Sequence, residues 1–316
     1  MSDTVQTASI QANHYRTIAT GGAFQLGVFV AFVTACIWAS WLVSVKIGVQ
    51  SALTTFDLAL MRYLMAGMIL LPFLYRARRL LLTVPKWTLF GIVFGAGVPF
   101  FFLSSTGMHY APVSHAGLLI PGTFPLFVSA IAVVVFKESL SRIRLLGLFA
   151  IMVGVVALLL ISLWSLEGEV WKGDLWFIGS SFFFAVYTVS LRVAGLPPLA
   201  ATGLLGLVST LFLLILLATG VVTSGMNLVS TDTLIGQFFI QSVLVGLGSG
   251  FSYGYAINVL GAERTAAMGA LTPVLASLLA IPLLDEPIGI AAAFGLCFVC
   301  LGVVFASGMV KSAGQK

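Results

Sequence analysis

Charged residues are absent from long stretches of this sequence, and this spacing limits the fold more than any other feature. No Asp, Glu, Lys or Arg lies between Arg16 and Lys46, and none lies in the fifty residues between Lys86 and Lys137. Over the whole chain 60% of residues are hydrophobic and 8% are charged, against roughly 25% charged residues in soluble domains. Because an α-helix needs about 20 apolar residues to cross a bilayer, the runs predict an all-α integral membrane protein.

The charge-free runs predict ten transmembrane helices. Most runs hold one span, and the two longest hold more than one span or a span with a loop. The spans are expected at 24–46, 56–75, 87–107, 114–136, 143–163, 174–193, 199–219, 235–259, 265–284 and 288–309. Residues 1–23 are polar and lack a short apolar core with a cleavage site, so we expect a disordered cytoplasmic tail and no cleaved signal peptide.

Basic residues gather in the loops on one side of the predicted membrane domain. Twelve of the 15 Lys and Arg residues lie there, namely Arg16, Arg76, Arg78, Arg79, Lys86, Lys137, Arg142, Arg144, Arg192, Arg264, Lys311 and Lys316. Only Lys46 and Lys172 flank the other side, and Arg62 lies inside a span. Cytoplasmic loops carry an excess of Lys and Arg. We therefore expect a multi-pass protein of the cytoplasmic (inner) membrane with both termini in the cytoplasm, and no nucleic-acid partner.

The chain also contains an internal repeat. Five residues recur 148 positions later, pairing Pro125, Ser129, Glu138, Gly147 and Gly154 with Pro273, Ser277, Glu286, Gly295 and Gly302. Six others are matched at an offset of 146, pairing Thr34, Trp38, Ala39, Trp41, Ser44 and Lys46 with Ser180, Phe184, Ala185, Tyr187, Ser190 and Arg192. The repeat predicts two five-helix halves, 24–163 and 174–309. Five is odd, so the second half must be inverted, as in many secondary transporters.

Two copies of one motif carry a family resemblance. Each copy is a proline-led apolar run that ends in Glu and is followed by two glycines, at Pro125, Glu138, Gly147 and Gly154 and at Pro273, Glu286, Gly295 and Gly302. Arg62 followed by Ala66-Gly67 is similar to the second helix of that repeat. The pattern resembles the drug/metabolite transporter superfamily, in its EamA-like ten-helix branch, and bacterial exporters of the aromatic amino-acid exporter type. This resemblance covers nearly the whole chain after the tail. It implies that helices 1, 3, 4, 6, 8 and 9 line a central cavity, with helices 5 and 10 more peripheral.

Two aromatic stripes are the first candidates for substrate contact. Thr34, Trp38 and Trp41 lie at i, i+4 and i+7, hence on one face of the first helix. The sixth helix repeats the stripe as Ser180, Phe184 and Tyr187. Aromatic faces can cover an apolar side chain or an ammonium group. The alternative is that these aromatics only pack helices together or face lipid.

Further candidates come from prolines and hydroxyls inside spans. Pro121, Pro125 and Pro273 each remove a backbone donor and free a carbonyl one turn earlier, for which Thr123 and Thr272 are close enough in sequence to be partners. Kinked packing helices are the alternative. Ser104 in the third helix and Tyr253 in the eighth are also expected to border the cavity.

Few groups can carry charge within the membrane. Arg62 could bind a carboxylate or snorkel to the interface, and His115 could titrate or be an interfacial histidine. No Asp or Glu lies in the middle of a span, so we expect transport to depend only weakly on a proton gradient. Cys297 and Cys300 lack a second Cys or His pair, and no metal site or cofactor is predicted.

The expected function is a secondary transporter that exports small amphipathic metabolites, above all amino acids, including aromatic and other neutral ones, by alternating access. A sugar-phosphate, nucleotide-sugar or drug carrier of the same superfamily is the alternative, although phosphate would require several Lys or Arg within the membrane. An integral-membrane enzyme is less expected, because no catalytic nucleophile–base pair is recognisable. The expected partners are a small-molecule substrate and the lipid bilayer, with a monomer or a homodimer both open.

Overall fold

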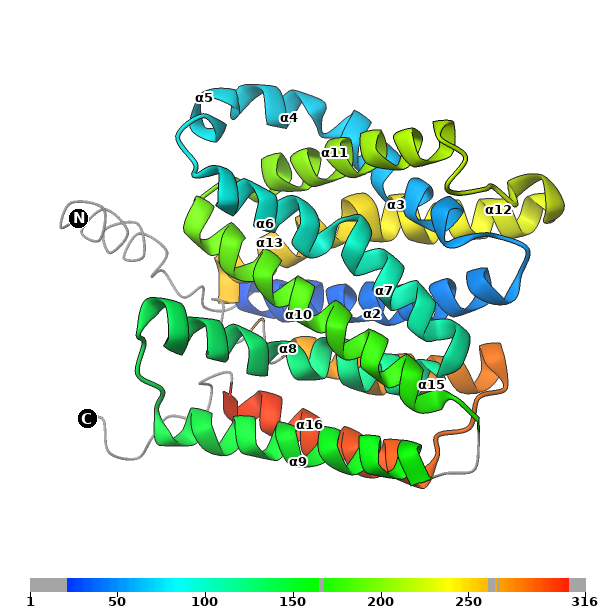
Figure 1. Ribbon diagram of the computed structural model, residues 1–316. Helices are drawn as coiled ribbons and strands as arrows, with labels where there is room; N and C mark the ends of the chain where they lie inside the picture. Colours follow the sequence, from blue (N-terminus) through cyan, green and yellow to red (C-terminus); the bar gives the residue numbers. More distant parts are fainter. Residues whose placement is uncertain (1–21, 165–167, 261–264, 266–267, 307–316) are drawn as a thin grey trace.

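The computed structural model describes residues 22–164, 168–260, 265 and 268–306, which form α-helices and short connections without a strand (Figure 1). The predicted tail 1–23 and the basic residues Arg264, Lys311 and Lys316 lie almost wholly outside the described residues. The main helices are α2 (Gly22–Gln50), α3 (Thr55–Ile69), α4 (Leu71–Arg76), α5 (Arg78–Leu81), α6 (Lys86–Ala96), α7 (Val98–Tyr110), α8 (Val113–Phe136), α9 (Arg142–Trp164), α10 (Val170–Ala194), α11 (Pro198–Ala218), α12 (Thr231–Phe238), η2 (Phe239–Ser249), α13 (Gly250–Leu260), α15 (Leu271–Leu284) and α16 (Ile290–Ala306).

Length and hydropathy qualify seven helical segments of the described chain as candidate membrane spans. Two shorter apolar helices, Leu271–Leu284 and Ala292–Ala306, lie near the C-terminus. The long helices run parallel or antiparallel to one another across Figure 1. Large apolar side chains cover the outside of the bundle, as on α9, where Leu146 and Phe149 are exposed. Such an apolar surface is typical of a protein that faces lipid.

Prolines divide two of the predicted spans into consecutive helices. Pro72 lies in the first turn of α4 and separates it from α3 at Leu70. Pro99 lies in the first turn of α7 and separates it from α6 at Gly97. Backbone groups freed inside a membrane need another partner. The hydroxyl of Tyr63 supplies one, because it lies 2.8 Å from the carbonyl oxygen of Ala96 and 2.9 Å from that of Gly97.

The internal repeat is visible in the local backbone. Lys137 and Asp285, which are 148 positions apart, are the non-glycine residues of the described chain with positive φ, at 57° and 54°. Each ends a helix in the left-handed conformation, and the next residue, Glu138 or Glu286, donates its N–H to a carbonyl six residues earlier. Non-glycine residues adopt this conformation rarely. Its occurrence twice at the repeat offset agrees with a two-repeat architecture.

The repeated glycines form the contact between α9 and α16, which lie side by side at one edge of the bundle (Figure 1). A Cβ added to Gly147 would lie 2.6 Å from the carbonyl oxygen of Gly302, and one added to Gly154 would lie 3.0 Å from that of Gly295. Each half thus contributes both glycines of its motif. Small residues allow the backbones of membrane helices to approach closely, so these glycines hold the two halves together.

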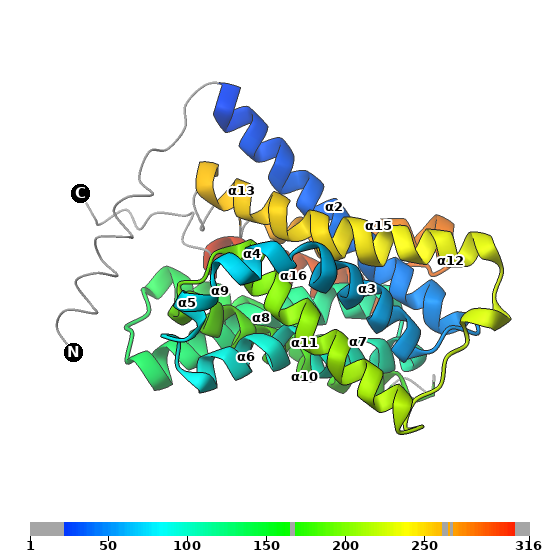
Figure 2. The ribbon, with the colours of Figure 1, turned by 90° about the horizontal axis from the view of Figure 1, so that it is seen from above.

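The N-terminal part of α2 extends away from most of the bundle, with α13 beside it (Figure 2). Ala31 of α2 packs there against Ala256 and Leu260 of α13. The C-terminal part of α2 instead lies beside α7, where Lys46 donates to the Met108 carbonyl oxygen, and beside η2, where Gln241 donates to Ser44. As a result, α2 contacts different helices at its two ends.

Candidate substrate cavity between the two halves

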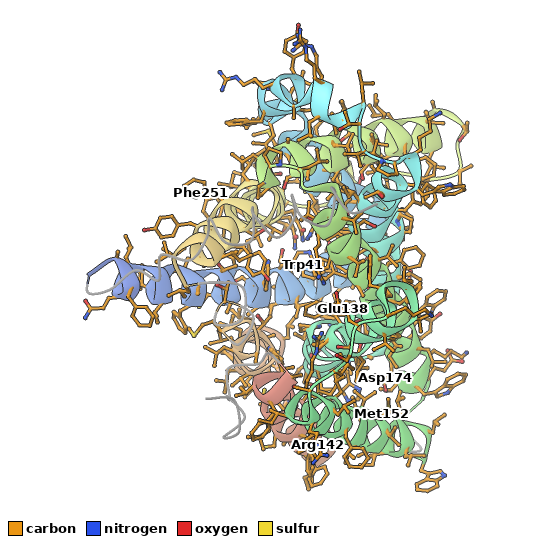
Figure 3. The ribbon with its side chains drawn as sticks, turned by 90° about the vertical axis from the view of Figure 1, so that its left-hand side faces the viewer. Trp41, Glu138, Arg142, Met152, Asp174 and Phe251 are labelled. Carbon is orange, nitrogen blue, oxygen red and sulfur yellow. The ribbon has the colours of Figure 1, made fainter. Side chains whose placement is uncertain are left out.

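A cavity of about 280 Å³ lies between the two halves of the chain. The first half contributes residues of α2, α3, α6, α7 and α8, and the second contributes residues of α10, α11, η2, α13, α15 and α16. Substrate sites of inverted-repeat transporters lie at the interface between repeats. Trp41, one of the lining residues, lies in the middle of the bundle in Figure 3, whereas Phe251 lies at its periphery.

The cavity occupies only one side of the membrane domain. We name the two sides by their basic residues, the Lys46 end and the Arg192 end. On α10 the cavity is lined from Phe184 to Leu191, and on α8 from Ile120 to Phe124. The first seven residues of α8, which belong to the Lys46 end, do not line it. The cavity therefore extends from the middle of the bundle towards the Arg192 end.

Aromatic side chains from both halves form most of the cavity wall. Trp38 packs against Tyr253, with 5.1 Å between ring centroids, and Phe184 packs against Tyr187 at 5.5 Å. Trp41 stacks on Phe100 at 5.7 Å. Rings in such arrangements attract each other beyond their burial. They present a stable apolar surface with a few polar edges.

Arg62 is the basic side chain that lines the cavity. Its guanidinium carbon lies 4.7 Å from the centre of the Trp41 ring. The π-helical segment η2 packs against α3 at this point, where a Cβ on Gly246 would lie 2.8 Å from the Arg62 carbonyl oxygen. π-helical turns are frequent at functional sites. Cation–π contacts contribute about 0.5–2 kcal/mol, whereas a buried charged donor without an acceptor costs more than the 1–3 kcal/mol of a neutral one. The rings alone therefore do not offset the cost of burying Nη1, which has no hydrogen-bond partner.

Nine of the residues proposed from sequence line the cavity: Trp38, Trp41, Arg62, Pro121, Phe184, Tyr187, Tyr253, Thr272 and Pro273. Pro125 lies outside the lining, one turn further along α8. The cavity also contains residues that sequence reasoning did not single out as site candidates, among them Phe100 and Thr202. Phe100 directly follows Pro99, and its aromatic side chain within a predicted span was the available signal.

Three predicted hydroxyls bond between helices instead of lining the cavity. Thr34 Oγ1 donates to Ser252 Oγ at 2.8 Å, and Ser104 Oγ lies 2.6 Å from Ser180 Oγ. These pairs are related by the repeat, since Thr34 and Ser180 are 146 positions apart and Ser104 and Ser252 are 148 apart. Hydroxyl bonds across helices stabilise membrane bundles. In each stripe, the hydroxyl residue (Thr34 or Ser180) therefore packs one helix against another, whereas the aromatic residues line the cavity.

The proposed threonine partners of the proline-freed carbonyls require correction. Thr123 Oγ1 donates to the Leu119 carbonyl oxygen at 2.6 Å, four residues before it, and Thr272 Oγ1 is buried without a hydrogen-bond partner.

The ninth predicted span is interrupted in the structure. Residue 270 forms a turn and α15 begins at Leu271, so Pro273 lies in the first turn of a helix and not in its middle. Proline is tolerated in a first turn because it displaces few helical hydrogen bonds there.

His115 lies at the Lys46 end, away from the cavity. Its Nδ1 is 2.8 Å from Oδ1 of Asp174, a fully buried residue of α10 (Figure 3). A second fully buried acid, Asp57, accepts hydrogen bonds from Ser224 and from the backbone of Thr54 and Gly225. Sequence reasoning singled out neither acid, because each lies in the first turn of a predicted span and not in its middle.

Two ion pairs connect the halves, and they are related by the repeat. Lys46 Nζ lies 3.5 Å from Glu286 Oε1, and Arg192 Nη2 lies 2.9 Å from Glu138 Oε1. The Lys46 pair is mostly buried, and Nζ also donates to the carbonyl oxygens of Met108 and Ala111, at 2.7 and 2.9 Å. The side chain of Arg192 is 69% exposed. The two equivalent pairs therefore differ in burial, one mostly buried at the Lys46 end and the other exposed at the Arg192 end.

A helical bundle with repeated halves, an apolar surface and a cavity between the halves defines a multi-pass membrane transporter. The comparisons with known proteins name its family. The model of the EamA-like transporter family matches residues 25–160 and again residues 171–308, so the chain belongs to this family, within the drug/metabolite transporter superfamily. The two matches coincide with the two halves of the repeat.

Individual relatives agree with this assignment. The chain is 28% identical over 229 residues to the uncharacterized transporter YyaM of Bacillus subtilis (strain 168), a match that covers 69% of this chain and 71% of that protein. A solved crystal structure superposes with a TM-score of 0.60 and 18% identity, covering 89% of this chain and 96% of the other. At this identity the superposition shows a shared fold.

Proposed function

We propose that this protein exports small amphipathic metabolites, foremost amino acids, across the cytoplasmic membrane. The observation that carries the proposal is the aromatic cavity between the halves, which extends towards one end of the bundle. Rings from both halves offer faces to an apolar side chain or to an ammonium group. A volume of about 280 Å³ lies just below the range of about 300–1,000 Å³ for drug-sized ligands, which favours a small solute over a nucleotide sugar.

Transport would proceed by alternating access in a ten-span bundle of two inverted repeats. The two equivalent ion pairs support this mechanism, because the Lys46 pair is buried in a closed end while the Arg192 pair is exposed at the open end. Two inverted copies can exchange their conformations at similar energy. In the opposite state the Arg192 pair would be buried and the Lys46 pair exposed.

The cytoplasmic side is assigned to the Arg192 end. Of the described basic residues, eight lie in the loops and helix ends of that side: Arg76, Arg78, Arg79, Lys86, Lys137, Arg142, Arg144 and Arg192. Lys46 and Lys172 lie at the opposite end. The positive-inside rule then gives cytoplasmic termini, and the cavity faces the cytoplasm, from which an exporter takes its substrate.

Counterflow in proteoliposomes tests the proposal. Purified protein is reconstituted, the vesicles are loaded with one unlabelled amino acid, and accumulation of the same labelled amino acid is followed for phenylalanine, leucine, threonine and glutamate. We expect accumulation of the amphipathic neutral amino acids above that in vesicles carrying Trp41→Ala. Absence of counterflow for every amino acid, with folded protein in the vesicles, would overturn the assigned substrate class.

A further inference from the structure

Two hydrogen-bond donors beside the cavity lack an acceptor. Arg62 Nη1 and Trp41 Nε1 are both buried and both without a hydrogen-bond partner, and both side chains line the cavity. The two side chains are neighbours, since the guanidinium carbon of Arg62 is 4.7 Å from the centre of the Trp41 ring. Buried polar groups in folded proteins are nearly always paired. Unsatisfied donors on two neighbouring side chains therefore indicate a ligand that supplies acceptors.

The charge of the cavity wall narrows the chemistry of that ligand. Arg62 is always protonated, and none of the ion pairs found in the described part of the chain includes it. No Asp or Glu is among the residues that line the cavity. The cavity wall thus carries one uncompensated positive charge. A group with negative charge and two acceptor oxygens satisfies both the donors and the charge.

Phosphate fits this wall less well than a carboxylate does. Phosphate sites use several cationic side chains or a loop of backbone N–H groups, and here one guanidinium and one indole are available. A carboxylate accepts two bonds side by side and carries a single charge. The rest of the wall is aromatic, with Trp38 and Tyr253 in contact at 5.1 Å, and it suits an apolar body attached to that carboxylate.

We propose that Arg62 and Trp41 bind the carboxylate of an amphipathic monocarboxylic acid, and that the ligand's ammonium group is not required. This inference rests on the proposed function and narrows its substrate class. An ammonium group beside Arg62 is repelled by the guanidinium, and the lining contains no acid to attract it. The cavity therefore favours a net anion over a zwitterion with the same apolar body.

Isothermal titration calorimetry on the purified full chain tests the proposal with three ligands that share one ring: phenylalanine, 3-phenylpropionate and 2-phenylethylamine. We expect 3-phenylpropionate to bind at least as tightly as phenylalanine, and phenylethylamine to bind more weakly than both. Binding of phenylethylamine as tight as that of phenylalanine would overturn the proposal, and so would the absence of binding by 3-phenylpropionate.

Two variants locate the carboxylate. Arg62→Gln should weaken binding of 3-phenylpropionate by roughly 10- to 100-fold, with little change for phenylethylamine. Trp41→Phe keeps a ring and removes only the indole N–H, so the loss should be about 2- to 10-fold. Unchanged affinity in both folded variants would overturn the assignment. Because binding is measured apart from transport, a chain that binds the acids but shows no counterflow refutes the proposed export alone.

Discussion

Lys46 at the end of α2 forms an ion pair with Glu286 beyond α15, with 3.5 Å between Nζ and Oε1, and this contact joins the first half of the chain to the second. Glu286 also accepts the backbone N–H of Val113 at 2.7 Å, at the start of α8. The two side chains thereby connect α2, α8 and α15 at the Lys46 end of the bundle. Their repeat equivalents, Arg192 and Glu138, make a single exposed contact at the other end.

Loss of the Lys46 charge should destabilise the protein more than loss of the Arg192 charge. Lys46→Met leaves the Glu286 carboxylate without its counter-charge and removes the donor to two carbonyl oxygens, and breaking a buried pair costs about 3–5 kcal/mol. Arg192→Met removes an exposed pair, which contributes about 0–1 kcal/mol. Chemical unfolding of both variants in one detergent measures the difference. Equal losses in the free energy of unfolding would show that the two ends are equally packed.

The α9–α16 contact should tolerate no side chain at Gly147. A Cβ there would collide with the backbone of α16 near Gly302, so Gly147→Ala is expected to cost about 1–3 kcal/mol through overpacking. Gly179→Ala is the matched control, since the nearest atom to its Cβ is Leu103 Cδ1 at 3.8 Å. Melting temperatures of both variants check this. A Gly147→Ala protein as stable as Gly179→Ala would contradict the close approach.

Truncation of a cavity aromatic should change affinity and not folding. Trp38 is half-buried against Tyr253 and lines the cavity, so Trp38→Ala should weaken binding by roughly 2- to 30-fold, as stacking contacts are worth about 0.5–2 kcal/mol. The loss should be greater for large apolar amino acids than for small ones. Trp87→Ala, at an 85% exposed site outside the cavity, is the control. Equal losses for phenylalanine and alanine in the Trp38 variant would assign Trp38 to packing.

The contact between His115 and Asp174 should stabilise the fold, and its removal should not change the coupling of transport to protons. His115→Ala removes the hydrogen-bond partner of Oδ1 of the fully buried Asp174, and leaving a buried acceptor unsatisfied should cost about 1–3 kcal/mol. Adding Asp174→Asn replaces the unsatisfied carboxyl group by a neutral amide of the same shape and should restore part of that loss. Thermal unfolding of the single and double variants measures it. In vesicles with a pH dye, substrate-driven proton flux that disappears in His115→Ala would instead show that this pair carries protons.

Cysteine labelling should report opposite sides for two exposed leucines. Leu82 follows α5 at the Arg192 end and is 88% exposed, and Leu228 lies between α11 and α12 at the Lys46 end and is 71% exposed. In a chain without Cys36, Cys297 and Cys300, Leu228→Cys should react with an impermeant thiol reagent in intact cells. Leu82→Cys should react only after lysis. Gly225 is unsuitable for labelling, because a Cβ there would collide with Ala52. The reverse pattern would invert the proposed orientation.

The sequence by itself determined that the chain is a membrane bundle with repeated halves. In lipid, the backbone N–H and C=O groups of a charge-free run must be hydrogen-bonded within the protein, and a helix does this within its own segment. The constraint can therefore be read from each segment of the sequence separately. The repeat offsets also identified Glu138 and Glu286, whose equivalent helix ends follow from one motif copied twice. Such patterns depend only on the residue type at each position and on the spacing between positions along the chain.

Only the tertiary structure decided which members of a stripe face the cavity. Thr34, Trp38 and Trp41 share one helix face, yet Thr34 bonds to Ser252 while the two tryptophans line the cavity. A helix contacts different neighbouring helices along its length. Residues on the same face of the helix therefore have different surroundings when they lie at different heights along its axis. The missing partner of Arg62 Nη1 was equally invisible in the sequence, because it depends on all the helices that surround the side chain, and those helices come from both halves of the chain.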